Sequence, residues 1–254
     1  MLRIDHVTHY FGGLRAVEDF CIDIAPQQII GLIGPNGAGK TTIFNLITGV
    51  YKPTQGKISF EDEDITGKLP YKITQHGIVR TFQNIRLFST MTVLENIMVA
   101  HHYRMKSGLL SSLMRLPSFT HEEEDTEALA TKFAKIFKLD DVLNVPAGSL
   151  PYGRQRRVEI ARALVTEPKM LLLDEPAAGM NPKEALELLD LIKQIAIDFK
   201  LTILLIEHQM PVVMGVAERI HVLDFGKTLA VGTPKEIQNH PKVIEAYLGE
   251  GAKI

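Results

Sequence analysis

The sequence predicts an α/β fold in which helices cover a mostly parallel sheet, together with an antiparallel β subdomain and an inserted α-helical lobe. Three observations support this prediction. Short apolar runs cluster in residues 1–60, helical periodicity dominates residues 90–149, and strands alternate with helices after residue 150. Such alternation is typical of a parallel sheet covered by helices. A chain of 254 residues with 45% hydrophobic composition can bury one large core.

The N-terminal part is expected to form strands, because its apolar runs are bounded by Gly and Pro turns. The expected strands are LRIDHVTHY (2–10), DFCIDIA (19–25), QIIGLIG (28–34) and GKISFED (56–62). One helix interrupts them over TTIFNLITG (41–49), where Ile43, Phe44 and Ile47 share a face and Gly49 ends the helix.

The middle of the chain is expected to form a helical lobe. Segments 91–105 and 123–139 repeat apolar residues at helical spacing, and the irregular segment 107–120 between them is expected to be a loop or short helices. We therefore expect a single domain over 1–254. Its core and β subdomain would comprise 1–88 and 156–254, and its helical subdomain would span about 89–155.

The C-terminal part alternates helix and strand. The expected helices are 154–165 and 182–199, and the expected strands are 169–175 and 201–208. The runs RIHVLDF (219–225) and KTLAVGT (227–233) are expected to pair as a hairpin.

Composition disfavours several classes of protein. The net charge of −2 is unlike that of proteins whose main partner is nucleic acid. The lone cysteine, Cys21, permits no internal disulfide, suits a reducing cytoplasm, and is expected to be a small buried apolar residue. The N-terminus lacks the apolar region of a signal peptide, and no apolar run approaches the roughly 18 residues of a membrane helix. A membrane role would therefore act through a partner.

The strongest motif is GPNGAGKTT (34–42), which fits G-x-x-x-x-G-K-[ST] and lies between an apolar strand and an amphipathic helix. Its glycines let backbone N–H groups converge on anionic oxygens, and the helix end adds positive charge. Lys40 would reach the β- and γ-phosphates, and the Thr41 hydroxyl would ligate Mg²⁺. The residues expected to contact nucleotide here are Asn36, Gly37, Ala38, Gly39, Lys40, Thr41 and Thr42.

An acidic strand end supplies the second half of the expected site. MLLLDEP (170–176) ends an apolar run in Asp174 and Glu175, whose side chains should point to opposite faces of the strand. Asp174 would hold Mg²⁺, and Glu175 would take a proton from the attacking water. The alternative is a solvated carboxylate pair.

A third strand ends at His208, at the strand end where ligands bind in such sheets. The sequence has no HExxH-type spacing of histidines, which disfavours a zinc site.

The ordered motifs resemble the nucleotide-binding subunits of ABC transporters, which have a P-loop NTPase core. TFQN places Gln83 at the Q-loop, SLPYGRQRR (149–157) falls at the signature, and AAGMNP follows Glu175 at the D-loop. Across the chain the sequence is similar to the LivG-type branch, from branched-chain amino-acid importers. The resemblance implies that Phe11 stacks on adenine, with Tyr10 as second choice, and it adds Ala16 to the nucleotide-binding residues.

The resemblance also implies a mechanism and partners. Two ATP-binding subunits, identical or sister chains, would hold two ATP molecules between them. The Gly153 N–H and the following helix end of one chain would face the γ-phosphate held by the other. Gln83 would sense metal and water, and His208 would contact the γ-phosphate. Permeases and, indirectly, an extracytoplasmic substrate-binding protein would complete the transporter, with this chain peripheral on the cytoplasmic face of the membrane and no nucleic-acid partner.

The signature departs from the usual family pattern Leu-Ser-Gly-Gly-Gln. Pro151 and Tyr152 replace Ser and Gly, and Arg154 replaces Gln, while Asn181 replaces the D-loop Asp. Arg154 could reach the γ-phosphate in place of the missing Ser, since a guanidinium can fork onto phosphate oxygens. Arg156 and Arg157 are expected to be solvated helix residues or intersubunit contacts.

A segment beside the lobe is a candidate docking site for a permease helix, comprising Ile85, Arg86, Leu87 and Phe88. The alternative is that Leu87 and Phe88 are core residues. Two other functions stay open at this point: the ATPase of another ABC system, such as lipid or lipopolysaccharide export, and an ABC ATPase acting on DNA or the ribosome.

Overall fold

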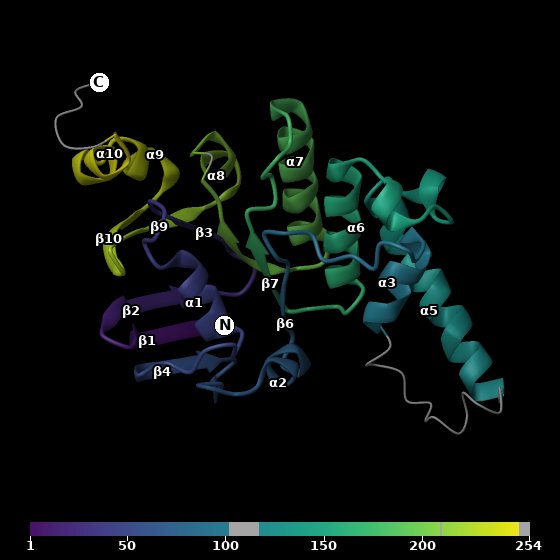
Figure 1. Ribbon diagram of the computed structural model, residues 1–254, viewed down its shortest axis with the longest axis horizontal. Coiled ribbons are helices and arrows are strands. Elements are labelled where there is room, and N and C mark those ends of the chain that lie inside the picture. The colour runs from purple at the N-terminus through teal and green to yellow at the C-terminus, as the bar shows by residue number, and fades with distance from the viewer. Residues whose placement is uncertain (102–116, 209, 249–254) are drawn as a thin grey trace. The chain divides into compact units, whose positions relative to one another are not determined.

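The computed structural model describes residues 1–101, 117–208 and 210–248 (Figure 1). Within this part of the chain, no helix is both long enough and apolar enough to cross a membrane. Of the irregular segment expected at 107–120, residues 107–116 lie outside the described residues. The remainder belongs to helix α5 (Pro117–Ile136).

Contacts divide the chain into two compact units. We call 1–80, 169–178 and 185–254 the core unit, and 81–168 with 179–184 the helical unit. The sequence placed the helical subdomain at about 89–155. In the structure, helix α6 (Tyr152–Leu164) also groups with the helical unit.

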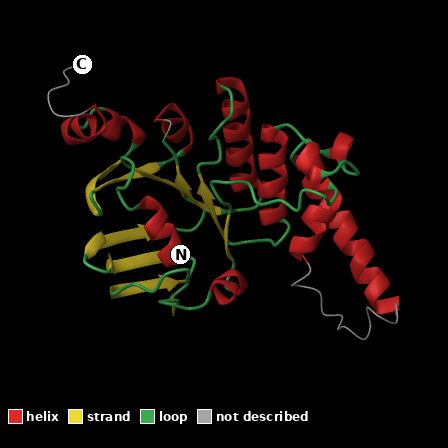
Figure 2. Ribbon diagram, in the orientation of Figure 1, coloured by secondary structure: helices red, strands yellow, loops and turns green. Residues whose placement is uncertain are grey.

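An antiparallel sheet forms one layer of the core unit, in the order β2-β1-β4-β5 (Figure 2). Its strands are β1 (Leu2–Phe11), β2 (Leu14–Ile24), β4 (Gln55–Phe60) and β5 (Glu63–Asp64). Exposed and buried residues alternate along much of β1 and β2, so one face of this sheet covers the core. Cys21 lies on the exposed face, so the prediction of a buried thiol is wrong.

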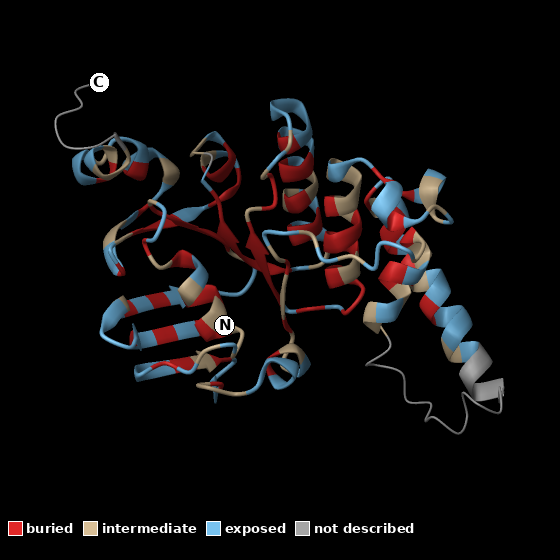
Figure 3. Cartoon of the chain, viewed as in Figure 1, coloured by how far each residue is buried: buried red, intermediate tan, exposed pale blue. Residues whose placement is uncertain are grey.

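A mostly parallel sheet forms the second layer, in the order β10-β9-β3-β8-β7-β6. Its strands are β3 (Ile29–Ile33), β6 (Ile78–Arg80), β7 (Met170–Asp174), β8 (Thr202–Ile206), β9 (Arg219–Asp224) and β10 (Lys227–Gly232). Every residue of β3, β7 and β8 is buried, which explains their continuous apolar sequences (Figure 3). The predicted hairpin is confirmed, because β9 and β10 pair antiparallel.

The helices that the periodicity predicted are present. They are α1 (Lys40–Ile47), α3 (Val93–His101), α5, α6 and α7 (Pro182–Asp198). Of the helix expected at 91–105, residues 102–105 lie outside the described residues. Within the described residues, four short α-helices were not predicted: α2 (Pro70–Gln75), α8 (Met210–Val216), α9 (Pro234–Gln238) and α10 (Pro241–Leu248). Elements this short repeat too few apolar positions for periodicity to reveal them. The Thr233–Glu236 capping box of α9 was a readable signal.

In the helical unit, α3 packs against α5 and α6. A buried amide fixes the turn before α3. Asn96 accepts a hydrogen bond from the Phe88 N–H at 2.9 Å and donates to the carbonyl groups of Phe88, Met91 and Thr92 at 2.9–3.2 Å. These bonds satisfy a polar side chain that has no exposed surface.

Candidate active site

The phosphate loop connects β3 to α1 at the carboxyl end of the parallel sheet. Gly34 and Gly39 have φ values of 152° and 101°. A Cβ atom would lie 2.1 Å from the Leu223 carbonyl oxygen at Gly34 and 2.7 Å from the Ala16 carbonyl oxygen at Gly39. Both positions therefore require glycine. The backbone carbonyl of Ala16, a predicted nucleotide-binding residue, lies against Gly39.

Lys40 begins α1 and folds its side chain across the loop. Its Nζ donates to the carbonyl oxygens of Gly34 at 2.7 Å and Pro35 at 2.9 Å. Burial lowers the pKa of Lys40, while the nearby charges of Glu175 and Asp174 act in the opposite direction. The structure thus brings the loop lysine and both predicted carboxylates together in the core unit.

The loop surroundings fit a nucleotide with Mg²⁺. Asn36, Gly37 and Thr41 are exposed, Thr42 is half-buried and Ala38 is buried. An exposed Thr41 hydroxyl and the carboxylate that ends β7 are hard oxygen donors of the kind Mg²⁺ prefers. Loop, helix end and oxygen donors therefore suit a phosphate group carrying this cation.

Asp174 ends β7 with 3% of its surface exposed. Its Oδ2 accepts a hydrogen bond at 2.6 Å from Arg80, at the end of β6. Arg80 also donates to Asn45 Oδ1 at 2.6 Å and lies over the Phe44 ring, with its Cζ 5.3 Å from the centroid. Arg80 was not among the site residues predicted from the sequence. The available signal was a charged residue ending an otherwise apolar strand beside the phosphate-loop helix.

We expect Arg80→Lys to lower the free energy of unfolding by about 1.5–3 kcal/mol, the range for a hydrogen bond to a charged group. Lysine keeps the charge but cannot fork between Asp174 and Asn45. Urea denaturation would measure the change, with the exposed Arg3→Lys as a control of the same chemistry. Equal stability of the two variants would contradict a supporting role for the Arg80 fork.

Glu175 follows β7 with a φ of 47°, a left-handed conformation that a non-glycine residue rarely adopts. Its N–H donates to the Ile206 carbonyl oxygen at 2.9 Å, and its Oε1 lies 2.5 Å from His208 Nε2. Glu175, the predicted base, and His208, the predicted γ-phosphate contact, are therefore in contact with each other. Their side chains retain 12% and 37% exposure respectively, so water can approach the pair.

A second carboxylate organises this corner. Glu207 is 2% exposed, and it accepts hydrogen bonds from the backbone N–H groups of Ala177 at 2.9 Å and His208 at 3.2 Å. It thereby ties the segment after Glu175 to the segment carrying His208. The sequence showed Glu207 at a strand end, and its scaffolding contacts became visible only in the structure.

Phe11 ends β1 with 42% of its surface exposed. Its ring makes edge contacts with His9 at 4.7 Å and Tyr51 at 5.1 Å between centroids. His9 and Tyr51 stack at 5.5 Å. Phe11 therefore presents a supported aromatic surface to solvent, and the adjacent Tyr10 is 40% exposed.

Gln83, Gly153 and Arg154 belong to the helical unit. Gln83 has an exposed side chain, and its backbone carbonyl accepts a hydrogen bond at 2.7 Å from Arg156. Arg156 is fully buried, so its prediction as a solvated or intersubunit residue is wrong. It also donates to the Phe82 carbonyl oxygen and Glu159 Oε2, both at 2.6 Å.

Gly153 lies inside the first turn of α6, whose N-cap is Pro151, rather than in a loop before the helix. The first-turn N–H groups of a helix have no intrahelical acceptor, which preserves the predicted anion-facing helix end. Arg154 Nη1 donates to Asp141 Oδ2 at 2.8 Å, so its guanidinium is engaged within the helical unit. Asn181 and Glu184 cap α7 through reciprocal side-chain-to-backbone hydrogen bonds of 2.9 and 3.3 Å.

The predicted docking segment, residues 85–88, is not core. Phe88 is 51% exposed, and Ile85 and Leu87 are half-buried. Arg86 is exposed and lies over the Phe82 ring, with its Cζ 4.4 Å from the centroid. The alternative in which both Leu87 and Phe88 belong to the core is therefore wrong.

A glycine-rich phosphate loop between a buried parallel strand and a helix, beside an acidic strand end, defines a P-loop NTPase. A family model described as ABC transporter matches residues 17–178, and one described as branched-chain amino acid ATP-binding cassette transporter matches residues 227–253. The chain belongs to the ABC transporter family, as an ATP-binding subunit that hydrolyses ATP.

Curated relatives and solved structures cover nearly the whole chain. The high-affinity branched-chain amino acid transport ATP-binding protein LivG of Escherichia coli is 49% identical, covering 98% of each chain. The corresponding BraF protein of Pseudomonas aeruginosa is 45% identical over the same share. The ADP conformation of MJ1267, an ATP-binding cassette of an ABC transporter, matches with a TM-score of 0.85 and 36% identity, covering 98% of this chain and 99% of that one.

Proposed function

We propose that this chain energises the uptake of branched-chain or related amino acids through partner permeases. The observation that carries the proposal is 49% identity, across 98% of both chains, to a branched-chain amino acid transport subunit. The match of residues 227–253 to the family model for branched-chain amino acid ATP-binding cassette transporters also supports the proposal. The chain would work at the cytoplasmic face of the membrane, held there by its permeases.

The proposed chemistry uses the phosphate loop and the carboxylates and histidine at the strand ends of the core unit, together with Phe11 and Gln83. Lys40 and the loop N–H groups bind the β- and γ-phosphates, while Phe11 stacks on adenine. Glu175 accepts a proton from the attacking water, and His208, now paired with Glu175, donates to the γ-phosphate. Thr41 and Asp174, with Gln83, would hold Mg²⁺, which neutralises phosphate charge.

The proposed assembly contains two ATP-binding subunits. Gly153 and the N-terminal end of α6 would face the γ-phosphate held by the other subunit, because the first-turn N–H groups attract anions. Whether the second subunit is identical or a sister chain would be decided by co-purification. A separate substrate-binding protein would deliver the amino acid to the permeases.

The decisive experiment is uptake of radiolabelled leucine, isoleucine and valine by cells that lack their own chain and carry it on a plasmid. Uptake should depend on the plasmid-borne chain and be lost with Lys40→Ala. The chain could instead bind ATP and co-sediment with membranes but restore no uptake of these amino acids. That result would indicate the ATPase of another ABC system, such as lipid or lipopolysaccharide export. Co-sedimentation with ribosomes or DNA would point to an ABC ATPase that acts on the ribosome or on DNA.

The docking segment yields a separate prediction. We expect Arg86→Glu with Leu87→Asp to abolish uptake while ATP binding stays within about twofold of wild type, because both residues lie outside the phosphate loop. Loss of the Arg86 contact with Phe82 should cost only about 0.5–1 kcal/mol of stability. Lys135→Glu, on the exposed face of α5, is the charge-matched control. Normal uptake in the double variant would refute docking at this segment.

A further inference from the structure

Three irregularities interrupt the pairing of β1 with β2. Ile4 pairs with Ile22 and Val7 with Phe20, so Asp5 and His6 together oppose Cys21. This is a β-bulge. A second bulge follows, in which β2 carries the extra residue before Val17 pairs with His9.

The bulges place two non-glycine residues in the left-handed region. His6 has a φ of 49° and Asp19 a φ of 51°. Their side chains are linked, since His6 Nδ1 lies 2.6 Å from Asp19 Oδ1. Backbone conformations of this kind are costly for non-glycine residues and tend to occur at functional sites.

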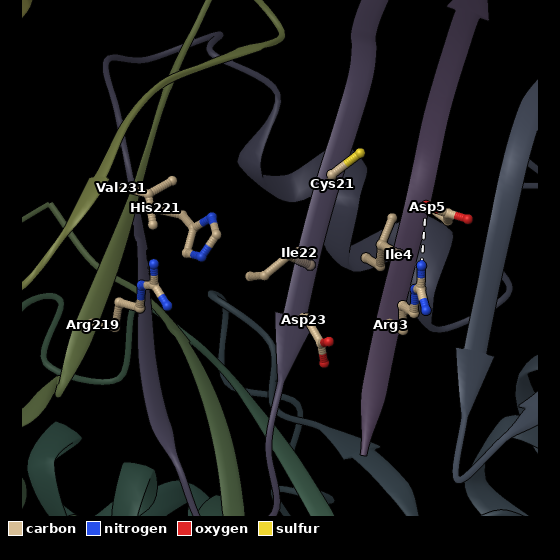
Figure 4. A pocket seen from close by; sticks show the side chains of 9 residues that line it. All are labelled: Arg3, Ile4, Asp5, Cys21, Ile22, Asp23, Arg219, His221 and Val231. Atoms are coloured by element: carbon tan, nitrogen blue, oxygen red, sulfur yellow. Dashed lines mark ion pairs between the residues drawn. The ribbon is translucent and has the colours of Figure 1, made fainter.

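The first bulge gathers three potential metal ligands. In a regular strand, successive side chains point to opposite faces, so Asp5 and His6 would diverge. Here a carboxylate oxygen of Asp5, an imidazole nitrogen of His6 and the Cys21 Sγ lie within 4.8 Å of one another. Figure 4 shows Asp5 and Cys21 on neighbouring strands. All three residues are exposed, so an ion can reach them from solvent.

The surroundings resemble the support that proteins give to a metal-binding histidine. Such histidines usually hydrogen-bond a carboxylate through one ring nitrogen, which fixes the ring and leaves the other nitrogen for the metal. Asp19 makes this contact with His6 Nδ1. The backbone N–H of His6 donates to Cys21 Sγ at 3.2 Å, which holds the sulfur atom beside the histidine.

We propose that Asp5, His6 and Cys21 bind a borderline-soft divalent cation of the Zn²⁺ class. Thiolate, imidazole and carboxylate are the ligands that zinc takes, at about 2.0–2.3 Å, and a solvent molecule would complete a tetrahedron. Ligand atoms of such a site lie about 3.5 Å apart, so the exposed side chains need only close inward. The competing ion pair of Arg3 with Asp5 is long, at 3.9 Å, and exposed, and it contributes little.

The test uses the lone cysteine of the chain as a reporter. Tag-free, reduced, full-length protein is titrated with Co²⁺ in excess Mg²⁺, which occupies hard oxygen sites. A thiolate-to-Co²⁺ charge-transfer band can arise only at Cys21. Wild type should develop this band stoichiometrically, and Zn²⁺ should displace it.

Variants separate ligands from their support. Cys21→Ser should remove the band, His6→Ala should weaken Co²⁺ binding at least tenfold, and Asp19→Asn should weaken it about 10–100-fold. His76→Ala is the control, because His76 also lies beside a carboxylate, Glu63, at 3.4 Å. Unchanged ATP binding would establish that each variant is folded. Absence of the band in wild type, or equal Co²⁺ affinity in wild type and His6→Ala, would overturn the proposal.

Discussion

Glu175→Gln is expected to bind ATP nearly as tightly as wild type and to hydrolyse it about 10²–10⁴-fold more slowly, the usual contribution of a general base. Glutamine keeps the shape of glutamate but cannot accept the proton of the attacking water. The backbone of residue 175 is held by its hydrogen bond to Ile206, and glutamine can still contact His208, so the surrounding structure should persist.

The measurement separates binding from chemistry. Equilibrium binding of a fluorescent ATP analogue gives affinity, and single-turnover hydrolysis gives the chemical rate. Glu187→Gln, at an exposed position on α7, controls for the loss of a carboxylate elsewhere. Hydrolysis by Glu175→Gln at the wild-type rate would remove Glu175 from the proposed role.

The same variant also tests the assembly. ATP joins the two subunits in the proposed mechanism, and hydrolysis removes the phosphate that both subunits hold. Glu175→Gln should therefore accumulate as an ATP-dependent dimer in size-exclusion chromatography with light scattering, whereas wild type should revert to monomer as ATP is consumed. A variant that stays monomeric with saturating ATP, both alone and mixed with any co-purifying sister chain, would contradict the shared site.

Features encoded locally could be predicted from the sequence. The phosphate loop depends on glycines at fixed spacing, and the structure places Gly34 and Gly39 where a Cβ would clash. Buried strands such as β7 and β8 have uninterrupted apolar sequences because helices or strands cover both faces. Asp174 and Glu175 were identifiable because the carboxyl ends of parallel strands gather ligands.

Features that depend on tertiary contacts could not be predicted from the sequence. Cys21, by contrast, could have been placed from the sequence, because it alternates along β2 with the buried Phe20 and Ile22. Arg156 is one of four arginines in residues 154–162, and nothing in the local sequence distinguishes it from Arg157. Its partners, Phe82 and Gln83, lie more than 70 residues away in sequence.

Arg156→Met should have the largest effect on stability, about 3–5 kcal/mol of unfolding free energy, because it leaves the buried Glu159 carboxylate without its cation. Arg157→Met, one position along α6 and only half-buried, should cost far less. Urea denaturation of both variants measures the difference. Similar losses in the two variants would show that the ion pair is not the source of the destabilisation.

A second substitution separates stability from catalysis. Adding Glu159→Leu to Arg156→Met removes the unpaired charge, so much of the lost stability should return. The carbonyl groups of Phe82 and Gln83 would still lose their hydrogen bonds from Arg156, so the backbone of the Q-loop would be held less firmly. Because misplacing a group near the chemistry by about 1 Å can cost about 10²-fold, kcat should stay low while the double variant folds. Recovery of both stability and kcat would mean that Arg156 supports the helical unit without positioning Gln83.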